Sequence, residues 1–173
     1  MLRLRRVSYA NSKENGVKRL RTETSRIDTV DASILATLAD DARTTLAELA
    51  RKVGLSAPSV AERVKRLEDN GVIRGYAVQI DPVALGLPLA VHIRIRPMPG
   101  QLAKLAALLN KLEAIVECDR VTGDDCFVAK AHVASVRELE VLIDKIIPLG
   151  STNTAIIQSS PVERRMPSIP IGD

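Results

Sequence analysis

The stretch from residue 45 to residue 70 constrains the fold more than any other part of the chain. Its first half places apolar residues at helical spacing and ends at Gly54, a residue suited to the positive φ at a helix C-terminus. Ser56 can then cap a second helix, whose first turn contains Pro58. Two helices joined by a short turn, the second with a basic outer face, predict a helix-turn-helix that reads DNA. A plain helical hairpin with a solvated charged face is the alternative.

The second helix supplies the candidate DNA contacts, which are Ser56, Ser59, Arg63 and Arg66. The last three recur at i, i+4 and i, i+3 spacing and therefore share one face. Serine hydroxyls can bond phosphates or base edges, and arginine can bind guanine through two hydrogen bonds or hold phosphate oxygens. Ser56 also fits the role of an N-cap, and Glu62 could instead pair with Arg66 on the surface.

Charge is distributed unevenly along the 173 residues, whose formal net charge is +4. Residues 1–25 hold seven basic and two acidic side chains, whereas residues 26–80 balance at eight of each. The N-terminal extension could therefore add sequence-independent phosphate contacts, or it could be a leader without a role. Aromatic residues make up only 2% of the chain, which argues against binding through base stacking.

No apolar run is long enough for a membrane span, and the N-terminus has no secretory signal pattern. We therefore expect a cytoplasmic protein. Cys118 and Cys126 form no disulfide framework or zinc-finger spacing, so we expect no metal and no cofactor. His92 and His132 each lie inside a predicted strand without an evident partner, so an enzyme is also not expected.

The chain divides by pattern into five segments. They are a basic extension (1–26), a three-helix helix-turn-helix domain of winged type (27–72), a strand linker (73–86), a larger domain (87–163) and a loose tail (164–173). In the larger domain, strands are expected over 87–97, 114–121, 126–133 and 152–160, with helices over 101–114 and 135–147. This β-α-β-β-α-β order predicts an α+β protein with a ferredoxin-like domain. Its open sheet face, with His92, Arg94, Arg96, Val128 and Ile157, favours a homodimer.

The order of a helix-turn-helix, a strand linker and a β-α-β-β-α-β domain resembles the Lrp/AsnC, or feast/famine, family. The stretches that carry the resemblance are residues 30–82, with an exit from Leu67 to Tyr76, and the hairpin ECDRVTGDDCFVAKAHV. The resemblance covers residues 27 to about 163. It implies a bacterial or archaeal transcription regulator, associated with the nucleoid, whose C-terminal half is an effector-sensing (RAM) domain. It also implies dimers that close into octamers and bind an amino acid or related metabolite between dimers.

The same resemblance places an effector site in the hairpin turn and at the start of the last strand. The residues it implies are Gly123, Asp124, Asp125, Cys126, Thr152 and Thr154. Cys126 stands where the family pattern has a second acid, and a thiol cannot hold an ammonium group as a carboxylate does. A plain hairpin turn and ordinary strand threonines are the alternatives.

Two other functions remain open from the sequence. A chromosome-architectural protein that compacts DNA without a ligand would suit the basic extension and the departure at Cys126. An enzyme on the ferredoxin-like scaffold would need a positioned base beside one of the cysteines.

Overall fold

The computed structural model describes residues 27–163 and 165–169. The expected basic extension therefore lies outside the described residues, as does part of the expected tail. The described residues form two compact units: one comprises residues 27–76 together with residues 166–169, and the other lies within Ala77–Arg165. Within the described ranges, no helix combines the length and the apolar character that crossing a bilayer requires.

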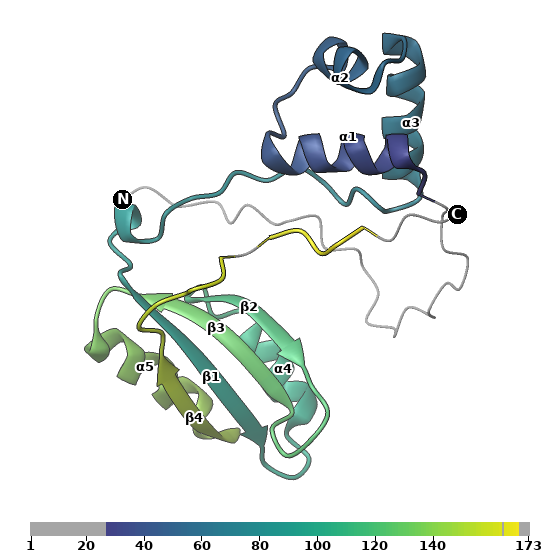
Figure 1. Ribbon diagram of the computed structural model, residues 1–173. Helices are drawn as coiled ribbons and strands as arrows, with labels where there is room; N and C mark the ends of the chain where they lie inside the picture. The colour runs from purple at the N-terminus through teal and green to yellow at the C-terminus, as the bar shows by residue number, and fades with distance from the viewer. Residues whose placement is uncertain (1–26, 164, 170–173) are drawn as a thin grey trace. The chain divides into compact units, whose positions relative to one another are not determined.

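The first unit contains the three predicted helices, α1 (Thr29–Asp40), α2 (Leu46–Val53) and α3 (Ala57–Asp69) (Figure 1). Each has a side-chain cap at its N-terminus. Ser56 caps α3 as predicted, and Thr45 forms a capping box with Glu48 at the start of α2. Gly54 adopts φ 70° and ends α2, which confirms the predicted turn.

A small apolar core holds the three helices together. Its buried members are Ile34, Leu35, Leu49, Ala50, Val60 and Leu67. Each such side chain stabilises the fold by roughly 1.5–3 kcal/mol, or less for alanine. Ile169, from the C-terminal segment, packs against the same core and is partly buried. The tail expected to be loose thus contributes one apolar side chain to the helical unit.

The expected strands after α3 are absent from the structure, and this is a correction to the predicted strand linker. Residues 74–80 are irregular, and a short 3-10 helix, η1 (Val83–Leu85), follows them. The physical reason is that a strand needs a neighbour to satisfy its backbone groups, and the described residues offer none there. Val78 is consequently 79% exposed and Ile80 62%.

The second unit has the predicted β-α-β-β-α-β order. Its elements are β1 (Leu89–Pro97), α4 (Leu102–Leu109), β2 (Ile115–Arg120), β3 (Phe127–Val133), α5 (Val136–Ile146) and β4 (Gly150–Ile156). The strands form one antiparallel sheet in the order β2-β3-β1-β4. β2 contains an irregularity between Ile115 and Glu117. The final strand begins and ends earlier than the sequence pattern suggested.

Alternation along β1 separates a covered face of the sheet from an open one. Val91, Ile93 and Ile95 are fully buried in a core that also contains side chains of both α4 and α5. His92, Arg94 and Arg96 alternate with them and are exposed. Both helices therefore cover one face, as the ribbon shows, and the other face is open (Figure 1).

Gly150 of β4 lies close to the backbone of β1. A Cβ atom at this position would lie 2.6 Å from the carbonyl oxygen of Arg96. We expect Gly150→Ala to force the strands apart and to lower the free energy of unfolding by about 1–3 kcal/mol. Ser151→Ala, at the next and exposed position, is the control for chemical denaturation. Equal stability of the two variants would contradict the close approach.

Candidate functional site

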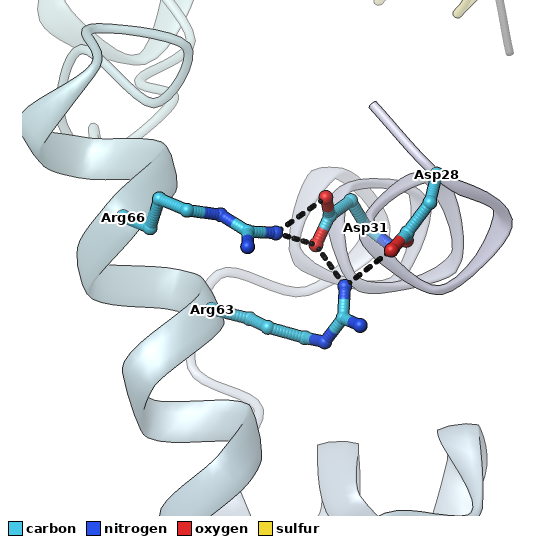
Figure 2. Close-up of polar contacts among 4 residues, drawn as sticks. All are labelled: Asp28, Asp31, Arg63 and Arg66. Carbon is cyan, nitrogen blue, oxygen red and sulfur yellow. Dashed lines mark hydrogen bonds and ion pairs between the residues drawn. The ribbon is translucent and has the colours of Figure 1, made fainter. Parts of the chain in front are cut away.

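Two arginines of α3 bind carboxylates at the start of α1. Nη1 of Arg63 donates to Asp28 Oδ2 at 2.6 Å and to Asp31 Oδ1 at 2.8 Å. Nη2 of Arg66 donates to both oxygens of Asp31, at 3.1 and 2.8 Å. Figure 2 shows the two side chains reaching from successive turns of α3, Arg63 to both acids and Arg66 to Asp31 alone. We call these four residues the Asp–Arg cluster.

The Asp–Arg cluster is partly removed from solvent. Asp31 is 1% exposed, so its charge requires paired partners. A backbone hydrogen bond from Asp31 and the bond from Arg63 lower the pKa of Asp28. The pKa of Arg63 is raised by hydrogen bonds with Asp28 and Asp31. Because the pKa of Asp28 is depressed on folding, its contribution to stability is present above the ordinary aspartate range and is lost as pH falls.

The serine candidates sit together at the N-terminus of α3. Ser56 Oγ accepts from the Ser59 backbone N–H at 3.3 Å and lies 2.8 Å from Ser59 Oγ. Ser56 is therefore the N-cap, and both residues are exposed. The four predicted DNA-contact residues do lie along one side of α3, but none of their side chains is free of a bond within the chain.

This arrangement changes how the predicted contacts can work. Arg66 binds Asp31 and not the alternative partner Glu62, because leaving a buried carboxylate unpaired costs more free energy than leaving an exposed one unpaired. Sequence reasoning missed the two acids, although Asp31 lies three residues before Ile34 and four before Leu35, on the apolar stripe. Lys52, Lys65 and Arg74 are exposed cations that pair with no carboxylate of the described residues.

The turn between β2 and β3 is held by Arg96 of β1. Nε of Arg96 donates to the carbonyl oxygen of Asp124 at 3.0 Å, and its Nη2 lies 3.4 Å from Asp124 Oδ2. The Cys126 N–H donates to the Ile95 carbonyl at 3.1 Å, and Gly123 has a φ of 108° that favours glycine. Arg96 was not predicted as a site residue, although it ends the basic row on the open face.

The remaining effector candidates do not join Asp124 in one pocket of a single chain. Thr152 and Thr154 pair in register with Ile95 and Ile93, so their side chains point to the helix-covered face. Arg96 belongs to the open face, and Asp124 binds it there. Asp125 and Cys126 are partly buried, and Cys126 packs against the core of the unit. The structure thus brings the turn and Thr152 to one end of the sheet but places them on different faces.

A shallow groove of about 730 Å³ lies near the other end of the open face, lined by His92, Glu117, Lys130 and residues 156–160 and 162. It contains none of the predicted effector residues. Within the described ranges, no three acids, histidines or cysteines are grouped to hold a metal. Burial and Asp119 raise the pKa of Cys118, and burial and Lys130 lower the pKa of His132.

Comparison with known proteins identifies both units. Residues 27–74 match the family described as winged helix-turn-helix DNA-binding, and residues 90–167 match the Lrp/AsnC ligand binding domain. The HTH-type transcriptional regulator LrpA of Mycobacterium tuberculosis is 38% identical over 129 residues, which cover 74% of this chain and 86% of that protein. LrpC of Bacillus subtilis is 33% identical over 78% of this chain and 93% of its own length.

Solved structures agree with these relatives. The structure of B. subtilis LrpC has a TM-score of 0.76 at 32% identity and covers 79% of this chain and 98% of that one. A feast or famine regulatory protein of M. tuberculosis complexed with L-methionine has a TM-score of 0.75 at 36% identity, covering 81% and 97%. The family resemblance and the predicted fold class are therefore confirmed, and the chain belongs to the Lrp/AsnC family of transcriptional regulators.

Proposed function

We propose that this regulator binds specific DNA sites through α3 and changes its DNA affinity when an amino acid or related metabolite binds the C-terminal unit. The observation that supports this most directly is that one chain contains two features. One is a capped α3 with ion-paired arginines, and the other is a ligand-binding domain in which Asp124 lies beside Arg96. The expected site of action is the bacterial or archaeal chromosome in the cytoplasm.

The DNA contacts proposed for α3 comprise contacts to base edges or phosphates and one sequence-independent phosphate contact. Ser56 and Ser59 lie at its N-terminus, where hydroxyls and backbone N–H groups can meet a phosphate or a base edge. Arg63 and Arg66 would contact DNA through the nitrogens that do not bind the acids. Lys65 would add a sequence-independent phosphate contact, since it is exposed and no described carboxylate pairs with it.

The proposed effector contact is the exposed pair of Arg96 and Asp124. An amino acid carries an ammonium and a carboxylate, which match a carboxylate and a guanidinium held side by side. The turn keeps its shape through the bond from Arg96 to the Asp124 carbonyl, so the carboxylate is presented on an ordered loop. The complex of a relative with L-methionine supports this ligand class. Thr152 and Thr154 would reach a ligand only where another dimer completes the site.

A homodimer, closing further to an octamer, is proposed from two unpartnered surfaces. Tyr76, Val78 and Ile80 alternate along the irregular linker and are all exposed, which is the pattern of a strand that lacks its neighbour. The open sheet face carries acids on β2 and bases on β1 and β3, with Glu117 in register with Lys130 and Lys130 with His92. Such a face can be self-complementary across a two-fold axis.

Lys65→Gln tests the proposed phosphate contact of Lys65. We expect it to weaken binding to all duplexes alike and to lower the slope of log affinity against log salt by about one unit, because one phosphate contact is lost. Lys145→Gln, on α5, removes the same charge from the other unit and is the control. Fluorescence anisotropy over a salt series measures both, and an unchanged slope for Lys65→Gln would exclude it as a phosphate contact.

Asp124→Asn tests the effector contact. Calorimetric titration with the standard amino acids, L-methionine included, should find at least one ligand that binds the wild type. The variant should bind it about tenfold more weakly, because a charged hydrogen bond is lost. Asp144→Asn, at an exposed position of α5 away from the open sheet face, should bind normally. Equal affinity of Asp124→Asn and wild type would remove Asp124 from the site.

Val78→Asp tests the linker as a contact between copies. A carboxylate placed in an apolar contact should weaken self-association by roughly tenfold or more. Gln79→Asp adds the same charge at the neighbouring position, on the other side of the extended segment. Sedimentation velocity over a dilution series separates them, and identical association of the two variants would argue against pairing at the linker.

A further inference from the structure

We infer that Asp28 and Asp31 are positioning residues for DNA recognition, which hold one edge of Arg63 and Arg66 so that the other edge of each guanidinium faces DNA. This rests on the proposed role of α3 as the DNA-reading helix. It assigns a recognition role to two carboxylates that would not themselves touch DNA, since Asp31 is almost fully buried.

Each guanidinium of the Asp–Arg cluster uses a single nitrogen to bind the acids. Arg63 uses Nη1 and Arg66 uses Nη2. Their other nitrogens bond no described residue, and the side chains of Arg63 and Arg66 keep 26% and 51% of their surface exposed to solvent. Arginine has five donors on a rigid plane, so fixing one edge also fixes the direction of the rest.

The cluster limits the freedom that DNA binding would otherwise remove. A free arginine side chain samples many rotamers, and ordering it on DNA costs conformational entropy. Arg63 is anchored at two carboxylates and its side chain is only 26% exposed. That ordering is therefore complete before DNA arrives, which favours a site whose phosphates or bases match the preset direction.

Charge and position predict opposite effects when an acid is removed. The cluster contains two carboxylates and two guanidiniums, so its net charge is zero and it adds little to long-range attraction. Deleting a carboxylate leaves an excess positive charge, which on charge alone would tighten binding to every duplex. If the carboxylate positions Arg63, its loss instead weakens binding to the preferred sequence. The sign of the change separates the two roles.

Asp28→Asn is the sharpest test, because it separates the cap from the ion pair. Asp28 Oδ1 accepts the Asp31 N–H at 2.7 Å and caps α1, while Oδ2 accepts from Arg63. Asparagine keeps a capping oxygen, as good N-caps do, but turns an amide donor toward the Arg63 donor. Asp40→Asn removes the same charge from the exposed end of α1, away from any described ion pair, and is the control.

The probe is a duplex that the wild-type full chain selects from a randomised DNA pool, compared with a shuffled duplex of the same composition. Affinities are measured at a temperature where thermal unfolding shows every variant fully folded, so lost stability alone cannot change them. For Asp28→Asn we expect roughly threefold to tenfold weaker binding to the selected duplex and little loss for the shuffled one. Asp40→Asn should keep the wild-type ratio. Asp31→Asn, if folded, should lower the ratio further, because it also releases Arg66.

An Asp28→Asn variant that binds the selected duplex as tightly as wild type, or more tightly, overturns the inference. Parallel weakening on both duplexes also overturns it, since that result indicates a general loss and not misdirected recognition. A wild-type chain that enriches no sequence from the pool contradicts the proposed DNA-reading function itself. If the wild type selects a sequence normally and Asp28→Asn binds it unchanged, only the positioning role of the acids is overturned.

Discussion

A charge buried in a very small core governs how the DNA-reading unit is assembled. Asp31 lies on the inner face of α1, and among the described residues the cations that compensate it come from α3. A buried carboxylate without partners costs far more than any one apolar contact contributes, so the arrangement that brings Arg63 and Arg66 to it is strongly favoured. Apolar packing brings the three helices together, and the ion pairs select how α3 is turned. Specificity of packing, and not added stability, is the usual benefit of such pairs.

The C-terminal unit meets the opposite problem, because its apolar core is ample but covers only one face of the sheet. The helices α4 and α5 shield most of that face, while the other face presents charged side chains and a shallow groove. The linker likewise exposes a row of apolar side chains. The exposed linker and the half-covered sheet are the two features that support the proposed association with further copies. The DNA affinities of several helix-turn-helix units, each with little net charge, would then combine.

Local patterns predicted most of the fold, and contacts between distant residues account for what they missed. Gly54 and Ser56 could be assigned from their neighbours, since turn and cap preferences are short-range. The alternation around Ile93 likewise located the central strand and its covered face. The bonds of Arg63 to Asp31 join residues 32 apart, so helical spacing alone left the arginines pointing outward. The alternation around Val78 predicted a strand that the structure does not show, because the described residues offer it no partner strand. Register, which no single segment encodes, put Thr152 on a different face from Arg96.

The irregularity in β2 has a consequence for the edges of the sheet. β2 and β4 are the two outer strands, and each leaves a row of backbone groups unpaired within the sheet. β2 is interrupted between Ile115 and Glu117 and carries charged side chains along its length, which are common barriers to unwanted pairing. β4, with the sequence GSTNTAI, carries no charge and no interruption in its ladder with β1. The sheet is thus guarded against polymerisation on one side only, so any lateral growth is directed to β4.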